Sequence, residues 1–245
     1  MASNSTTPIK RPRRVVLYSH DTFGLGHLRR SRALASALTQ SDTVQSAIIL
    51  TGSPVAGRFT FPERVDHVRL PGVTKLPDGS YISQTLGLDI EEITSLRAGL
   101  IESAMKQYDP DLLIVDKEPT GFRGELLPTL ERLKAEGKTK TVLGLRDVLD
   151  EPKVLATEWA RKGAVDATEK YYDNIWVYGV KSVYDPTDGL DLSPETRDRM
   201  HWTGYLRRAI TDPADTPTDP YILITPGGGG DGKAMVDQVL AAYEQ

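Results

Sequence analysis

The sequence predicts an α/β protein built on a doubly wound parallel sheet. Short apolar runs alternate with longer helical patterns along most of the 245 residues. The runs VVLYS, AIIL, LLIVD and TVLGL are apolar throughout, which is typical of strands buried on both faces of a parallel sheet. Regular alternation of such strands with helices predicts a sheet that is covered by helices on its faces.

Seven strands are expected, each at a short β-rich run. They cover residues 14–19, 46–51, 65–70, 111–116, 139–145, 174–178 and 201–205. Helical patterns occupy residues 28–39, 90–107, 124–136, 154–161 and 194–199. In the first of these, Leu28, Leu34 and Leu38 recur at helical spacing, so this helix has an apolar face to lay on the sheet.

A change in composition divides the chain near residue 207. The stretch RRAITDPADTPTDP, residues 207–220, is rich in proline and poor in apolar residues, which predicts a stiff, exposed linker. A strand over 221–225, a glycine-rich loop and a helix from Lys233 onward then begin a second unit. We therefore expect a disordered tail over 1–12, a main domain over 13–206, the linker, and an incomplete second domain over 221–245. A unit this small cannot bury enough apolar surface to fold alone, so the natural chain is expected to continue.

Composition excludes several classes of function. The net charge of −4 gives no overall field that would attract nucleic acid or an anionic membrane. Without cysteine, the chain has no disulfide, thiolate metal site or cysteine nucleophile. No apolar run approaches the roughly 20 residues that span a bilayer, and the N-terminus lacks the apolar core of a signal peptide. We expect a cytoplasmic protein with no transmembrane segment and no nucleic-acid partner.

The stretch TPGGGGDGKAM, residues 225–235, matches the G-x-x-x-x-G-K pattern of phosphate-binding P-loops. Ala234 follows the lysine, where a P-loop ATPase needs Ser or Thr to hold magnesium. Glycines between a strand and a helix still let backbone N–H groups approach a phosphate beside the positive end of the helix dipole. A hinge turn without a ligand is the alternative. The candidate phosphate-binding residues are Gly227, Gly228, Gly229 and Gly230.

The loop after the first strand, in YSHDTFGLGHLRRSRALASAL, carries His20, Asp21 and His27 together with Gly24 and Gly26. It is not a dinucleotide-binding fingerprint, because an arginine stands at the position of the third glycine.

Arginines crowd the start of the helix that follows this loop. Arg29, Arg30 and Arg32 lie in its first turns, where cations oppose the helix dipole at about 0.3–1 kcal/mol each. This indicates a compensating anion, either Asp21 or a bound phosphate or carboxylate. A solvated basic face is the alternative.

Taken in order, three features resemble the GT-B glycosyltransferases. They are the opening strand, GLGH loop and long helix, the strand DPDLLIVD over 109–116, and the glycine-rich loop of a second unit. The chain resembles the N-terminal, acceptor-side half of that Rossmann-like fold. Within the family it most resembles the branch that contains the peptidoglycan-precursor N-acetylglucosaminyltransferase and its uncharacterised predicted-glycosyltransferase relatives.

This resemblance implies a hexosyltransferase-type enzyme. Such an enzyme moves a sugar from a nucleotide-diphosphate sugar to an acceptor hydroxyl, with inversion and without a metal. No cofactor is implied beyond the nucleotide-sugar co-substrate. The resemblance does not identify the acceptor, which could be a lipid-linked or another glycan. Peripheral contact with a membrane is also left open.

The resemblance also implies roles for individual residues. The GLGH loop, here Gly24, Gly26 and His27, closes over phosphates in the interdomain cleft of the family. The glycine loop at 227–230 contacts the donor diphosphate, and the remaining nucleotide contacts lie beyond residue 245. Transfer needs a base for the acceptor hydroxyl, and a histidine suits this task because its usual pKa is near neutrality. His27 and His20 are the candidates.

Polar residues that follow two other strands are further candidates. Asp116 ends the run LLIVD, and Arg146 and Asp147 follow VLGL, all at carboxyl ends of parallel strands, where ligands bind in such sheets. Asp116 and Asp147 are candidates to bind hydroxyls or to orient a histidine. For Lys117 and Glu118, which follow Asp116, pairing as surface ions is at least as good an explanation as such a role.

Other interpretations stay open at this point. Asp109-Pro110-Asp111 matches the D-x-D motif of metal-dependent sugar transferases, but it precedes a strand and is better explained as a turn. A non-enzymatic ligand-binding or regulatory module with the same fold is one alternative function. A P-loop-type nucleotide-binding protein is the other.

Overall fold

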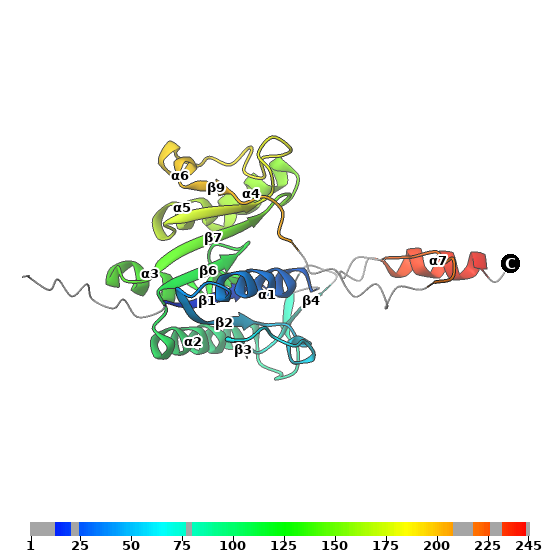
Figure 1. The fold of residues 1–245 in the computed structure, drawn as a ribbon, viewed down its shortest axis with the longest axis horizontal. Coiled ribbons are helices and arrows are strands. Elements are labelled where there is room, and N and C mark those ends of the chain that lie inside the picture. Colours follow the sequence, from blue (N-terminus) through cyan, green and yellow to red (C-terminus); the bar gives the residue numbers. More distant parts are fainter. Residues whose placement is uncertain (1–12, 21–24, 77–79, 208–217, 226–231, 244–245) are drawn as a thin grey trace, which may run out of the picture.

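A seven-stranded, wholly parallel sheet forms the centre of the protein, in the order β3-β2-β1-β6-β7-β8-β9 (Figure 1). The computed structural model describes residues 13–20, 25–76, 80–207, 218–225 and 232–243. The strands of this sheet are β1 (Arg13–Ser19), β2 (Val44–Thr51), β3 (Val65–Arg69), β6 (Leu112–Asp116), β7 (Lys140–Arg146), β8 (Asn174–Tyr178) and β9 (Met200–Trp202). The α/β parallel fold and all seven predicted strands are confirmed.

The helices are α1 (Gly26–Thr39), α2 (Ile90–Tyr108), α3 (Leu127–Glu136), α4 (Pro152–Lys162), α5 (Ala164–Tyr171), α6 (Pro194–Asp198) and α7 (Lys233–Tyr243). Short 3-10 turns lie at Ala56–Arg58 and Phe122–Gly124. Helix α2 begins with a capping box in which Asp89 and Glu92 each accept a hydrogen bond from the other's backbone N–H.

A two-stranded hairpin and one helix were not predicted. Strands β4 (Val73–Lys75) and β5 (Tyr81–Ser83) form a small antiparallel hairpin. Each has only three residues, too few for a pattern of alternation to be recognised. The other is α5, which begins directly after Gly163 ends α4 in the left-handed conformation, at φ 60°.

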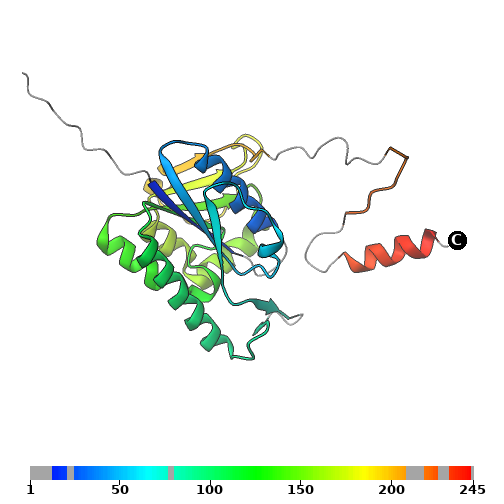
Figure 2. The same ribbon diagram turned by 60° about the horizontal axis from the view of Figure 1, so that its bottom comes forward.

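Alternate residues of the strands face two separate cores. On one face Val16 and Tyr18 of β1 pack with side chains of α2, α3, α4 and α5. On the other face Val15 and Leu17 pack with the apolar side of α1. Figure 2 shows α1 in blue on one side of the sheet and the green helices on the other. Burial on both faces explains why the strand sequences are continuously apolar.

The second predicted unit is described only in part. Its helix is present as α7, and none of its residues is buried. The structure gives no strand over 221–225, where Ile222 and Leu223 are exposed. This differs from the prediction, because a strand needs a hydrogen-bonded neighbour and no described strand pairs with these residues. Gly227, Gly228, Gly229 and Gly230 lie outside the described residues. The domain boundaries therefore stay predictions.

Among the described residues, no helix is both long and apolar enough to cross a membrane.

Candidate functional site

The candidate site lies where the order of the sheet reverses. The connection after β1 leads through α1 to β2 on one side, whereas the connection after the neighbouring β6 leads through α3 to β7 on the other side. In open α/β sheets such a switch point leaves a crevice outside the carboxyl ends of the strands. Helix α1 begins here at Gly26, and β6 ends here at Asp116.

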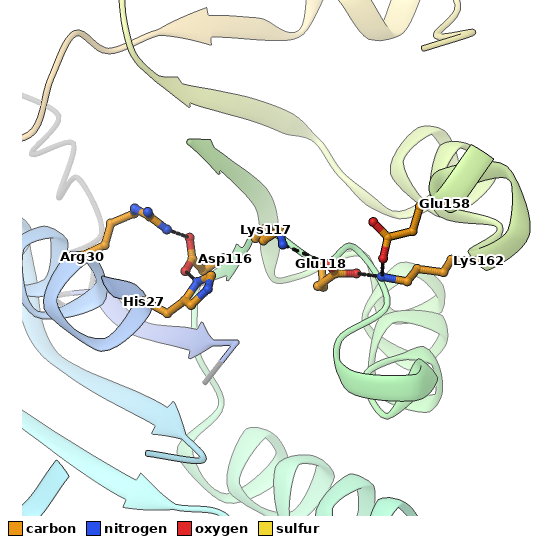
Figure 3. A network of polar contacts seen from close by, with 7 residues as sticks. All are labelled: His27, Arg30, Asp116, Lys117, Glu118, Glu158 and Lys162. Atoms are coloured by element: carbon orange, nitrogen blue, oxygen red, sulfur yellow. Dashed lines mark hydrogen bonds and ion pairs between the residues drawn. The ribbon is translucent and has the colours of Figure 1, made fainter. Parts of the chain in front are cut away.

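Asp116 joins two side chains from the first turns of α1 (Figure 3). Its Oδ2 lies 2.6 Å from Nδ1 of His27, and its Oδ1 accepts a hydrogen bond of 2.6 Å from Nη1 of Arg30. The side chain of Asp116 is 6% exposed, so this carboxylate is almost completely removed from water. A buried charge needs such partners. The predicted candidates His27, Arg30 and Asp116 therefore form one cluster.

The environment keeps Asp116 ionised. Burial by itself would raise the pKa of its carboxyl, but the hydrogen bond from His27 and the charge of Arg30 outweigh burial and lower that pKa. An ionised carboxylate can only accept hydrogen bonds, so Nδ1 of His27 must carry the hydrogen. In the neutral imidazole this leaves Nε2 with a free lone pair. Nε2 of His27 can therefore accept a hydrogen bond.

Arg30 also explains how the crowded helix start is stabilised. The predicted anion was Asp21 or a bound ligand, but Asp116, which is 86 residues away in sequence, supplies the charge. Arg32 instead stacks on Phe59 and Phe61, with its guanidinium carbon 4.8 and 5.5 Å from their ring centres. Arg29 is exposed, with no ion pair to another described residue. Asp21 lies outside the described residues.

His20 follows β1 directly and lies beside His27, with the two ring centres 5.8 Å apart in a T-shaped arrangement. Its Nδ1 is buried and has no hydrogen-bond partner among the described residues. Burial, followed by the nearby His27 and Lys117, lowers the pKa of the His20 imidazole well below its usual value. His20 is therefore neutral at physiological pH.

We expect replacement of His20 with glutamine to flatten the loss of stability in acid. The unfolded chain protonates this imidazole below about pH 6.5, whereas the folded protein keeps it neutral to lower pH. Across that window the unfolded state binds more protons, so the free energy of unfolding falls as pH falls, by at most about 1.4 kcal/mol per pH unit. Urea unfolding from pH 7 to 5 measures this slope. His201→Gln, at an exposed residue, is the matched control, and an unchanged slope in His20→Gln would contradict the assignment.

Glu118 differs from the prediction of a surface ion. It is 7% exposed, and its Oε2 lies 2.9 Å from Nζ of Lys162, at the end of α4. Lys162 also contacts Glu158 at 2.7 Å, and Lys117 lies 3.7 Å from Glu118 (Figure 3). This pairing could not be predicted from the sequence, because 44 residues separate Glu118 from Lys162.

The loop after β6 has a tight, well-anchored backbone. Lys117 and Arg123 adopt positive φ angles of 69° and 49°, which are uncommon for residues other than glycine. Two buried tyrosines hydrogen-bond to the backbone of this loop. The hydroxyl of Tyr18 accepts a hydrogen bond from the backbone N–H of Phe122 at 3.0 Å, and that of Tyr172 donates to the carbonyl of Pro119 at 2.5 Å. The loop is thus held in place before any ligand binds.

A cavity of about 580 Å³ opens beside this loop. His20 lines it and also contacts His27, so the cavity adjoins the His27–Asp116 pair. Its other lining residues come from the β4–β5 hairpin, the start of α2, the loop after β6 and the end of α4. The volume is within the range of small-molecule sites in proteins. A second hollow, of about 500 Å³, lies at Arg13 and Lys138, at the opposite edge of the sheet.

The remaining predicted site residues are not part of this cluster. Arg146 is exposed at the end of β7, and Asp147 is half-buried after it. Among described residues, neither forms a hydrogen bond or ion pair with His27 or Asp116. Gly26 is the first residue of α1, whereas Gly24 lies outside the described residues.

The D-x-D interpretation is not supported by position. Asp109 ends α2 in the left-handed conformation, and Asp111 accepts a hydrogen bond from the backbone N–H of Arg14 at the start of β1. This is the edge of the sheet opposite to His27. Among the described residues, no group of three histidine, aspartate or glutamate side chains could hold a metal ion.

Comparison with solved structures shows a glycosyltransferase fold. A UDP-glucosyltransferase from Polygonum tinctorium, capable of glucosylating indoxyl and solved with 3,4-dichloroaniline, matches with a TM-score of 0.50 and 14% identity. The match covers 83% of this chain and 55% of that one. The glycotransferase of kitacinnamycin matches with a TM-score of 0.49 and 14% identity, over 86% of this chain and 56% of its own. The calicheamicin glycosyltransferase matches with a TM-score of 0.42 and 17% identity, over 86% of this chain and 56% of its own.

The match to the UDP-glucosyltransferase shows the Rossmann-like fold of the GT-B glycosyltransferases, and the peptidoglycan branch stays a prediction. The chain spans little more than half the length of each of these three solved structures. Neither a protein-family model nor a curated protein sequence matches the chain.

Proposed function

We propose that this chain is the acceptor-side part of a glycosyltransferase. The enzyme would move a sugar from a nucleotide-diphosphate sugar to an acceptor hydroxyl, with inversion and without a metal. The observation that carries the proposal is the His27–Asp116 pair at the switch point of the sheet, with the two side chains 2.6 Å apart and a cavity beside them. The likeness in fold to a UDP-glucosyltransferase supports the same reaction class.

In this proposal His27 is the general base. Its Nε2 takes the proton of the acceptor hydroxyl while the oxygen attacks the anomeric carbon of the donor. The new carbon–oxygen bond forms as the bond to the diphosphate breaks, and the diphosphate leaves with the electron pair. Attack opposite to the leaving group inverts the anomeric carbon. Asp116 holds the ring through Nδ1 and stabilises the imidazolium that forms, as a carboxylate does beside a catalytic histidine elsewhere.

The diphosphate needs stabilisation as its charge develops. We assign this task to backbone N–H groups of the glycine loop at 227–230 and to the start of the helix behind it, on the argument from sequence. The remaining contacts to the nucleotide would come from polypeptide after residue 245. The acceptor would enter the cavity that His20 lines, so that its hydroxyl reaches His27.

The proposal predicts that donor binding requires the second domain. Calorimetry with UDP-glucose, UDP-N-acetylglucosamine and dTDP-glucose would compare residues 1–245 with a protein that includes a complete second domain. We expect at least one donor to bind the longer protein at least 100-fold more tightly, because most nucleotide contacts are supplied there. Sugar transfer by the longer protein that continues in the presence of EDTA would support the proposal that the reaction needs no metal. Tight binding of a donor by residues 1–245 alone would contradict the proposal.

A further inference from the structure

The cavity beside His27 is lined by both apolar and cationic residues. Tyr81, Ile90, Phe122 and Leu127 are apolar, and the rings of Tyr81 and Phe122 meet edge to face with their centres 4.9 Å apart. The guanidinium carbon of the buried Arg97 lies 5.7 Å from the Phe122 ring centre. The two rings are therefore held in place by neighbouring side chains, and they suit contact with a flat, apolar group.

Three cations line the same cavity, namely Arg123, Arg161 and Lys162. The single carboxylate among its described lining residues is Glu118, and it is already paired with Lys162 at 2.9 Å. The two arginines are left with little compensation. Arg123 reaches Glu91 only at 3.5 Å, in an exposed pair, and Arg161 has no ion-pair partner among the described residues. The cavity thus carries an excess of positive charge from two different elements.

Arginine suits the recognition of a specific anion. Its planar guanidinium presents paired N–H groups that match the two oxygens of a carboxylate or phosphate. A neutral acceptor could accept hydrogen bonds from these arginines but would gain no attraction between opposite charges. An anionic acceptor would gain this attraction, and its apolar body would at the same time cover the rings of Phe122 and Tyr81.

We propose that this cavity selects an acceptor that joins an aromatic or other flat apolar body to an anionic group, with Arg123 and Arg161 as the determinants. The anion is a carboxylate or a phosphate. That the bound molecule is the acceptor rests on the proposed glycosyl transfer, whereas its binding does not, because every residue invoked belongs to this chain.

The test is binding to the 245-residue protein without a donor. The probes are 4-hydroxybenzoate, 4-hydroxyphenyl phosphate and neutral 4-hydroxybenzamide, followed by NMR titration of backbone amides. We expect an anionic probe to bind at least tenfold more tightly than the amide and to shift the signals of Thr120 and Phe122. The ratio between benzoate and phosphate then distinguishes the two kinds of anion.

Variants assign the preference to the two arginines. In the double variant Arg123→Gln/Arg161→Gln, affinity for the anions should fall about tenfold while affinity for the amide changes less than twofold, because each lost exposed ion pair is worth a modest amount. The matched control is Arg58→Gln, an exposed arginine that does not line the cavity. The double Arg→Lys variant should retain part of the preference.

Three results would overturn the inference. They are equal affinity for charged and neutral probes, an unchanged preference in the double glutamine variant, and no saturable binding of either anion. None of them depends on sugar transfer. If the anions bind as expected but the longer protein transfers no sugar, the anion site stands and the proposed function fails.

Discussion

In a longer protein that includes a complete second domain, replacing His27 with alanine is expected to lower kcat by about 10²–10⁴-fold. The loss follows because, among the described residues, no other imidazole nitrogen lies within hydrogen-bond distance of a carboxylate. Donor affinity should change less than twofold, because the acceptor hydroxyl, not the nucleotide, is the group that His27 serves. Steady-state kinetics and calorimetry on the same samples separate the two effects.

One further variant and a control define the role of the His27–Asp116 pair. Asp116→Asn should also lower kcat by at least tenfold, because an amide no longer fixes which nitrogen carries the hydrogen or stabilises the imidazolium. His201→Ala is the matched control, since His201 hydrogen-bonds Asn174 at 3.1 Å and is exposed. Unchanged turnover in His27→Ala would remove this residue from the mechanism.

Replacing Glu125 with glutamine should cost about 3–5 kcal/mol of the free energy of unfolding. Glu125 receives hydrogen bonds of 2.6 and 2.7 Å from the guanidinium of Arg97, and 2.7 Å from the hydroxyl of Tyr18. The side chains of Arg97 and Glu125 are 2% and 0% exposed. The variant would leave the charge of Arg97 buried and unpaired, which is the costly case for a buried ion pair.

Urea unfolding at pH 7 measures this cost. The matched control is Glu102→Gln, which breaks the half-exposed pair with Lys106 and should cost about 1 kcal/mol or less. The double variant Arg97→Met/Glu125→Leu should recover part of the loss, because it removes both charges together. A cost for Glu125→Gln no larger than that of the control would contradict the account of this network.

The sequence was sufficient to predict the main sheet because its strands are buried on both faces and so read as uninterrupted apolar runs. It was also sufficient to predict that Asp116 lies at the crevice edge, since the carboxyl ends of parallel strands share one edge. It could not pair Arg30 with Asp116, or Glu118 with Lys162. Those contacts depend on which helices follow which strands around the sheet, and the partners are 86 and 44 residues apart.

The cavity was missed for a related reason. Arg123 and Arg161 stand in ordinary polar surroundings in the sequence, and neither belongs to a motif. The positive φ angles that shape the loop at Lys117 and Arg123 occur at residues that seldom adopt them, so nothing in the residue types indicated them. Gly121 and Gly124, also at positive φ, were the available signal for a tight loop here.

The central claim is that Asp116 fixes His27 with its hydrogen on Nδ1, so that Nε2 can accept the proton of a hydroxyl. Two-dimensional ¹H–¹⁵N NMR of the imidazole of His27 tests it directly, with His27→Ala used for assignment. The account predicts the Nδ1–H tautomer in wild type and a mixture of tautomers in Asp116→Asn. A neutral ring with its hydrogen on Nε2 would contradict it, because the free nitrogen would then be Nδ1, which faces Asp116.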